Sequence, residues 1–325
     1  GFLLYDPVSD IYLKEWNADL HFTPASNTKI FTTVACLESL KDSIPTYDLV
    51  EENGAAHIAP FGDPTFLHPD FPSQPAILPL LNIETTIHLP ESKIQAFGPG
   101  WAWDDYQYSF QSERSWMPIY ANEVRIYNSD TLHVIPSFFE DYIDLYIGER
   151  PGSFVYRELD YNLFNIWIEN DTSGFERKIP FQYSDELLGI LLKDTIGSIT
   201  QVTNKPLTGY KTTVYNQSTI AALALMMQRS DNFLAEQLLI TAGKFKGYNN
   251  QDAFRSRLLS SWGLSEEVSW VDGSGLSRYN LFTPRALVKV LDRIYDQLDW
   301  HEIQAVFPNG GRSGTIKYWY PGVTE

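Results

Sequence analysis

Apolar positions follow two different periods along this chain, and the change between them predicts its first elements. Residues 1–15 read as a hairpin, because β-rich runs flank the turn-forming segment Asp6–Asp10. Beyond Thr23, which we expect to be the N-cap, apolar residues such as Ile30 and Val34 fall at helical spacing. The chain therefore opens with a hairpin followed by an amphipathic helix.

The region from about 44 to 204 has a different pattern. It is dense in prolines and aromatic residues, and short β-rich runs at 123–127, 153–156 and 165–168 are separated by turn signals. One helix is expected from Ser184, its cap, to Leu192. This pattern predicts a mainly β domain.

Helical periodicity returns from about residue 205. Ser218 is the expected cap of an apolar run, and a second helix is expected over Phe233–Thr241, ending at Gly243. Asp272-Gly273-Ser274-Gly275 is a loop by composition, and Thr283-Pro284 starts a further helix. The resulting organisation is one domain formed by 1–43 and 205–325, interrupted by an insertion domain over 44–204.

Composition narrows the classes of function. The 325 residues are 43% hydrophobic and 20% charged, as in a folded protein, and the formal net charge is −17. This acidity repels nucleic-acid phosphates and anionic membranes at long range, which argues against nucleic acid as a partner. No run approaches the roughly 18 apolar residues of a membrane-spanning helix. Cys36, the one cysteine, is expected to be a small buried hydrophobe.

The segment Ser26-Asn27-Thr28-Lys29 has the residues for nucleophilic catalysis. A serine hydroxyl needs a base, and residues three apart share one face of a helix, so Lys29 can lie beside Ser26. The helix N-terminus would also favour an oxyanion formed there.

The segment Ser230-Asp231-Asn232 lies between two predicted helices. There Ser230 can relay a proton and Asn232 can bind a substrate amide, and the two segments together form two of the three motifs of penicillin-recognising serine enzymes.

Longer segments carry a family resemblance. Gly62-Asp63-Pro64-Thr65, Gly98–Asp105 and Asp272–Arg278 occur in the same order as similar segments of the D-alanyl-D-alanine carboxypeptidase/endopeptidase family, the class C low-molecular-mass penicillin-binding proteins. The chain resembles this family over nearly its whole length. The resemblance implies an α+β peptidase domain of the penicillin-binding/serine β-lactamase type, split by a mainly β insertion.

The resemblance also implies function. It indicates a serine-type D-Ala-D-Ala carboxypeptidase or endopeptidase that acts on peptidoglycan stem peptides, is acylated by β-lactams and works in the periplasm or elsewhere outside the cytoplasm. Ser26, Lys29 and Ser230 would be catalytic, and Asn232 would bind substrate. No cofactor is implied.

One motif of this family is missing from the sequence. No Lys-Thr-Gly box is present: Lys211-Thr212-Thr213 precedes Ser230, and Arg312-Ser313-Gly314-Thr315 resembles the segment before the box. We expect the box to follow Glu325.

Other functions remain open at this stage. A glycosidase could use Asp104 and Asp105 as carboxylates beside sugar-stacking aromatic residues. The six histidines are scattered without the spacing of metal ligands, so no metal site is expected. A non-catalytic peptidoglycan-binding relative is a third possibility, although all four site residues are retained.

Overall fold

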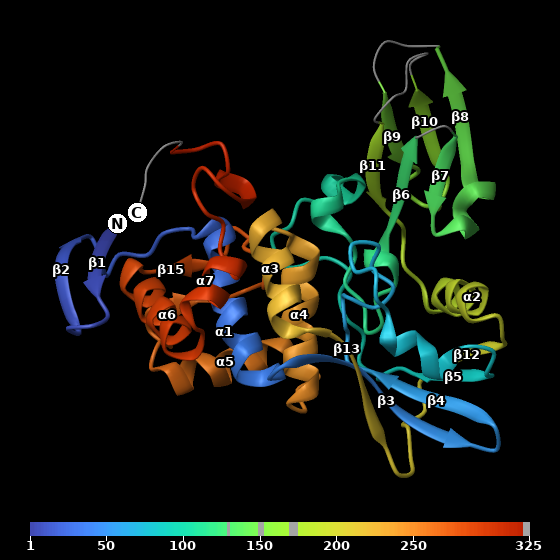
Figure 1. Ribbon diagram of the computed structural model, residues 1–325, viewed down its shortest axis with the longest axis horizontal. Coiled ribbons are helices and arrows are strands. Elements are labelled where there is room, and N and C mark those ends of the chain that lie inside the picture. Colours follow the sequence, from blue (N-terminus) through green and yellow to red (C-terminus); the bar gives the residue numbers. More distant parts are fainter. Residues whose placement is uncertain (129–130, 149–152, 169–174, 321–325) are drawn as a thin grey trace. The chain divides into compact units, whose positions relative to one another are not determined.

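The computed structural model describes residues 1–128, 131–148, 153–168 and 175–320. The chain divides into two compact units (Figure 1). One, which we call the helical unit, comprises residues 1–45, 98–101 and 217–325. The other, the sheet unit, comprises residues 46–97 and 102–216. The mixed α and β content agrees with the predicted fold class.

Residues 98–101 belong to the helical unit, although they were expected in the insertion domain. The second junction also differs from the expected one, since it lies after Asn216 and not after residue 204. The reason is strand β13 (Thr212–Ser218), which pairs beside β3 (Ser43–Glu52) at the end of a sheet. The chain thus leaves and re-enters the helical unit on neighbouring strands, and the Thr219 N–H donates to Asp42 O (2.9 Å) just beyond them.

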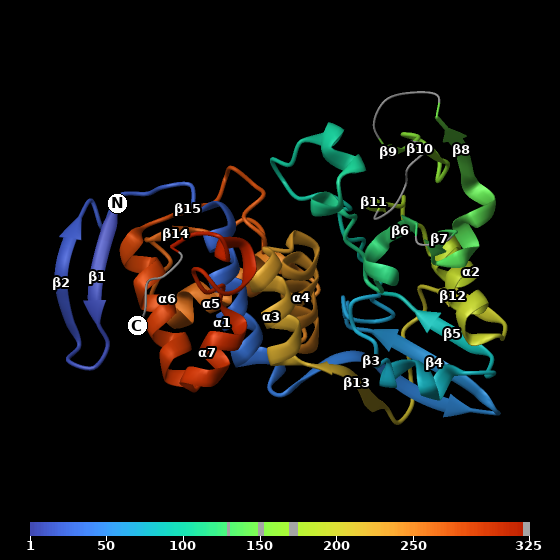
Figure 2. The same cartoon turned by 45° about the horizontal axis from the view of Figure 1, so that its top comes forward.

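Helix α1 (Thr28–Leu40) lies among the other helices of the helical unit and packs against α4 and α6 (Figures 1 and 2). Phe31 on α1 contacts the rings of Trp262, Trp270 and Phe282, with centroids 4.4–6.1 Å away. Cys36 is fully buried, as expected. The remaining helices are α3 (Thr219–Arg229), α4 (Asn232–Phe245), α5 (Gln251–Trp262), α6 (Pro284–Gln297), α7 (Trp300–Val306) and the 3-10 turns η1 (Ala25–Asn27) and η7 (Gly314–Ile316).

Most predicted helix starts are confirmed, and one predicted stop is wrong. The Ser218 and Thr283 side chains accept from the N–H groups of residues 221 and 286, as N-caps do. Helix α4 does not end at Gly243 but continues to Phe245. A Cβ at position 243 would lie 3.0 Å from the Phe254 ring, so the glycine allows α5 to approach closely.

The short strands of the helical unit form two pairs. Strands β1 (Phe2–Asp6) and β2 (Ile11–Trp16) make the predicted antiparallel hairpin. Strands β14 (Val268–Ser269) and β15 (Leu281–Phe282) pair at the two ends of the loop that contains Asp272.

In its described residues the sheet unit contains three sheets, which confirms the predicted β-rich character. The predicted helix capped by Ser184 is also present. The five-stranded sheet has the order β12-β5-β4-β3-β13, and the two three-stranded sheets have the orders β11-β6-β7 and β8-β10-β9. The elements not yet bounded are β4 (Ala55–Pro60), β5 (Thr85–His88), β6 (Glu123–Asn128), β7 (Leu132–Ile135), β8 (Ile143–Ile147), β9 (Phe154–Arg157), β10 (Phe164–Ile168), β11 (Glu176–Pro180), β12 (Thr200–Thr203), α2 (Asp185–Ile196) and the 3-10 turns η2 (Pro75–Leu80), η3 (Trp103–Gln107), η4 (Ser109–Gln111), η5 (Tyr120–Asn122) and η6 (Ser137–Tyr142).

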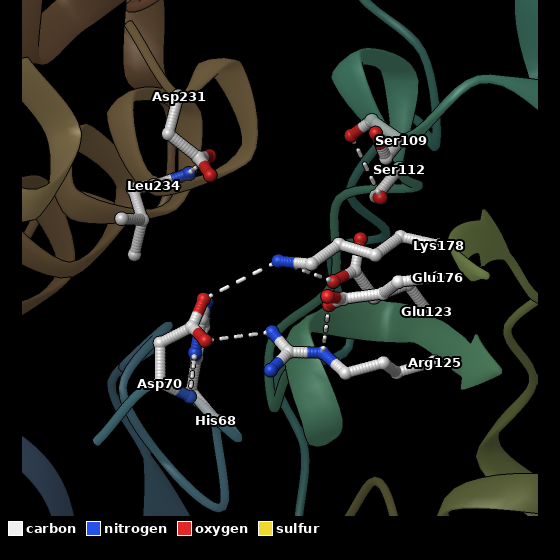
Figure 3. Close-up of polar contacts among 10 residues, drawn as sticks. All are labelled: His68, Asp70, Ser109, Ser112, Glu123, Arg125, Glu176, Lys178, Asp231 and Leu234. Atoms are coloured by element: carbon white, nitrogen blue, oxygen red, sulfur yellow. Dashed lines mark hydrogen bonds and ion pairs between the residues drawn. The ribbon is translucent and has the colours of Figure 1, made fainter. Parts of the chain in front are cut away.

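A network of charges joins a loop of the sheet unit to strands β6 and β11. Figure 3 shows the Asp70 carboxylate between Arg125 (2.8 Å) and Lys178 (3.3 Å). Lys178 also lies 3.5 Å from Glu123, and Arg125 lies 3.8 Å from Glu176. Each cation has two acidic neighbours, and the two ion pairs of Asp70 fix the loop to the sheet.

Asp63, from the Gly-Asp-Pro-Thr segment, is the buried centre of a second polar cluster. Its carboxylate accepts from the Thr65 N–H (2.8 Å), the Thr65 hydroxyl (2.6 Å) and the Thr46 hydroxyl (2.7 Å). Burial outweighs these hydrogen bonds and raises the pKa of Asp63 to about 6. The cluster ties β3 to the loop after β4.

We predict that Asp63→Ala lowers the free energy of unfolding of the sheet unit by about 3 kcal/mol, because it leaves three buried donors without their acceptor. Urea unfolding at pH 8, where the native carboxylate is ionised, measures the change. Asp160→Ala removes an exposed carboxylate from the same unit and should change stability by no more than about 0.5 kcal/mol. Equal midpoints for the two variants would contradict the structural role of Asp63.

Candidate active site

The first motif lies at the start of α1. Ser26 is the middle residue of the 3-10 turn η1 and is exposed, whereas Lys29 in the first turn of α1 is 1% exposed. Thr23 is not the N-cap expected from the sequence: the turn begins after Pro24, and Ala25 has a φ of 48°. This tight entry presents the hydroxyl outside the helix while the lysine points into the interior.

The second motif forms the corner between α3 and α4. Ser230 ends α3 in a left-handed conformation with a φ of 56°. Asp231 is the N-cap of α4, and its carboxylate accepts from the Leu234 N–H (2.9 Å), a contact that is also drawn in Figure 3. Asn232 is the first residue of α4. The motif therefore spans a helix end and a helix start, as predicted.

The structure brings all four predicted site residues together. The Ser26 and Ser230 hydroxyls lie 2.9 Å apart, within the roughly 6 Å reach of direct or one-water proton transfer. The Lys29 amine lies 3.2 Å from Ser26 Oγ and 2.7 Å from Asn232 Oδ1. A third neighbour, the Ser274 carbonyl oxygen, is 2.9 Å away.

The three neighbours of the Lys29 amine are chemically unequal. The carbonyl oxygens of Asn232 and Ser274 can only accept, whereas the Ser26 hydroxyl can also donate. A neutral amine has two N–H donors and one lone pair, so it can donate to both carbonyls and direct the lone pair at the Ser26 hydroxyl. The arrangement therefore suits a lysine that takes the proton of Ser26.

The electrostatic environment makes the neutral amine accessible near neutral pH. Burial lowers the pKa of Lys29 to about 8, against the opposing charges of Asp231, Glu236 and Asp272. A base works best when its pKa lies near the working pH. An unperturbed lysine, with a pKa of about 10.4, would be almost fully protonated there.

The loop containing Asp272 supplies the part of the site that sequence reasoning missed. Asp272 is fully buried, and its carboxylate accepts from Gly275 N (2.8 Å), Ser277 N (2.6 Å), Asn280 Nδ2 (2.7 Å) and Trp101 Nε1 (2.9 Å). The sequence identified this segment as a loop with family resemblance. The loop contacts Lys29 through the main-chain carbonyl of Ser274, and the residue type does not predict a main-chain contact.

Two glycines let the loop fit between the 3-10 turn η1 and helix α4. A Cβ at Gly275, whose φ is 87°, would lie 1.9 Å from the carbonyl oxygen of Ala25. A Cβ at Gly273 would lie 2.6 Å from the carbonyl oxygen of Ala235. Distances this short are not tolerated, so both positions require glycine.

The carboxylates of the alternative glycosidase interpretation, Asp104 and Asp105, lie in the first turn of η3 in the sheet unit. They are adjacent in the sequence, on one short turn.

Within the described residues, no cluster of three or more His, Cys, Asp or Glu side chains could hold a metal ion. A helix long and apolar enough to cross a membrane is also not found in that part of the chain.

A buried lysine beside an exposed serine, with a Ser-Asp-Asn corner against both, is the arrangement expected from two of the three motifs of penicillin-recognising serine enzymes. Comparison with known families agrees. Residues 170–321 match the D-Ala-D-Ala carboxypeptidase 3 (S13) family, a stretch that contains the Ser230 motif and the Asp272 loop but not Ser26. The family resemblance drawn from the sequence motifs is thereby confirmed, in that this part of the chain is similar to the S13 carboxypeptidases.

Individual proteins support the same relationship. The chain is 33% identical over 101 residues to the D-alanyl-D-alanine carboxypeptidase DacB of Haemophilus influenzae, an aligned stretch that spans 29% of this chain and only 21% of that protein. The crystal structure of penicillin binding protein 4 (dacB) from Haemophilus influenzae is similar with a TM-score of 0.71 and 21% identity, over 97% of this chain and 79% of that one. Its complex with a β-lactam is similar with a TM-score of 0.66 and 19% identity, over 97% and 78% of the two chains. These structures share the fold of this chain.

We predict that Gly275→Ala displaces η1, the turn that contains Ser26, because the added methyl group would meet the main chain of Ala25. The rate of modification of Ser26 by a β-lactam should fall by about 10²-fold, a loss typical of a catalytic group moved by about 1 Å. Gly247→Ala is a matched control, since Gly247 also has a positive φ (88°) but has open space at its Cβ. Equal reactivity of the two variants would refute this steric role.

Proposed function

We propose that this chain is the serine-peptidase part of a D-Ala-D-Ala carboxypeptidase or endopeptidase that acts on peptidoglycan stem peptides. The observation that carries the proposal is the Lys29 amine, which is 2.7 Å and 2.9 Å from two obligate acceptors and 3.2 Å from the Ser26 hydroxyl. Of these three neighbours, the Ser26 hydroxyl alone can also donate a proton to the amine.

In the proposed reaction, Ser26 Oγ attacks the carbonyl carbon of the penultimate D-Ala while Lys29 takes the hydroxyl proton. A proton then passes through the Ser230 hydroxyl, 2.9 Å from Ser26, to the nitrogen of the leaving D-Ala, and the C–N bond breaks. Water hydrolyses the resulting ester with the same groups in reverse. A β-lactam would acylate Ser26 by the same first step.

The other components of the proposal come from the family relationship. Asn232 would donate its side-chain N–H₂ to a substrate carbonyl, because its Oδ1 already accepts from Lys29. The substrate lies outside the cytoplasm, so the enzyme would work in the periplasm or at another extracytoplasmic site.

We expect labelled penicillin to form a covalent adduct on Ser26 in the full-length protein. Intact-mass analysis and peptide mapping measure the adduct, and Ser26→Ala should abolish it. Ser9→Ala, which changes a hydroxyl on the exposed turn of the hairpin, should leave it intact. An adduct that persists in Ser26→Ala would exclude Ser26 as the nucleophile. Complete absence of acylation in the wild type would favour the non-catalytic or glycosidase alternatives.

We expect Lys29→Arg to acylate about 10²-fold more slowly, or slower still, because arginine keeps the charge but does not release its proton near neutral pH. Stopped-flow measurement with a fluorescent penicillin gives the rate, and circular dichroism checks that the variant is folded. A folded variant that acylates at nearly the wild-type rate would rule out Lys29 as the base.

A further inference from the structure

Glu236 is a buried carboxylate for which the proposed reaction gives no role. It lies on α4, four residues after Asn232, and is 3% exposed. Residues four apart share one face of a helix, so Glu236 and Asn232 both face the Lys29 region. A carboxylate this deeply buried is costly unless charges or donors stabilise it. One of its donors is the Ser274 N–H, 2.8 Å from Oε1.

The two peptide groups that flank Ser274 are each fixed on both sides. In the first, Gly273 O accepts from the Thr32 hydroxyl (2.6 Å) and the Ser274 N–H donates to Glu236. In the second, Ser274 O accepts from Lys29 (2.9 Å) and the Gly275 N–H donates to Asp272 (2.8 Å). The carbonyl that meets the lysine therefore has its direction set by two carboxylates.

We propose that Glu236 and Asp272 are positioning residues for the catalytic base: together they orient the Ser274 carbonyl, which in turn directs the Lys29 lone pair at Ser26. This inference rests on the proposed function and adds to it. Neither carboxylate would touch the substrate or the reacting atoms.

The same carboxylates have a second effect through their charge. The acidic groups that act on the Lys29 amine are Asp231 at the N-cap of α4, Glu236 on α4 and Asp272 in the loop, and all three raise its pKa against the larger effect of burial. Loss of one negative charge must therefore lower the pKa of Lys29 below its value of about 8. Acylation requires the neutral amine, so the pH at which the rate begins to rise should fall as well.

The test separates charge from position with two variants in the full-length protein. Glu236→Gln keeps an oxygen that can accept from the Ser274 N–H but removes the charge, whereas Glu236→Ala removes both. Glu38→Gln is the control, because Glu38 lies on α1 but bonds to Trp262 and Arg293 instead of the loop. Acylation by fluorescent penicillin is measured from pH 5.5 to 9.5, and thermal unfolding confirms that each variant is folded.

We expect the acidic limb of the Glu236→Gln profile to move to lower pH by about one unit, so that this variant acylates faster than wild type below pH 7. Glu236→Ala should be slower by about tenfold or more at the high-pH plateau. The control should match wild type. An unmoved limb in Glu236→Gln, or a plateau in Glu236→Ala equal to that of wild type, would overturn the proposal.

A second readout does not depend on acylation. Titration of the Lys29 side chain by NMR, with ¹³C-labelled lysine and Lys29→Arg to assign the signal, should give a lower midpoint in Glu236→Gln than in wild type. If wild type is not acylated, the proposed function fails, yet this midpoint still decides whether Glu236 acts on Lys29. An equal midpoint in both proteins counts against that action.

Discussion

Burial of one amine is the constraint on which the rest of the helical unit depends. The Lys29 side chain is 1% exposed, and a buried ammonium without compensation is strongly unfavourable. Two carbonyl oxygens stabilise the buried amine, one from the start of α4 and one from the Asp272 loop. Helix α1, helix α4 and the loop must therefore meet at a single point. Gly273 and Gly275 follow from that requirement, because only residues without a Cβ let three main chains come this close.

The pairing of strands β3 and β13 explains how a long insertion is tolerated. The 200 residues between Lys29 and Ser230 (230 − 29 − 1) include the whole sheet unit. They leave on β3 and return on the neighbouring strand β13, and the Thr219 N–H bonds to Asp42 O directly beyond that junction. Because the two ends are held together, the entropy of closing the intervening chain is small compared with that of a free loop of this length.

Sequence reasoning succeeded where the signal was local and failed where it was not. The caps Ser184, Ser218 and Thr283 each satisfy an N–H group three residues later, so the residue type alone predicted the helix starts. Thr23 is not the N-cap because the first turn begins only after Pro24, with Ala25 at a positive φ, and the residue types do not predict this entry. The Ser-x-x-Lys and Ser-Asp-Asn motifs predicted that their four residues meet, which the structure shows. They did not predict Glu236, whose buried partner is 38 positions away in the sequence.

Under the proposed function, the carboxylates around Lys29 allow the lysine both to accept and to return a proton. Burial alone would lower its pKa so far that the amine would be neutral but too weak a base to hold the serine proton. Three carboxylates alone would keep it protonated and unable to accept one. The combination gives a pKa of about 8, at which both states are accessible near neutral pH. Under the proposed function, the buried acid one helical turn after the motif asparagine contributes to the catalytic arrangement.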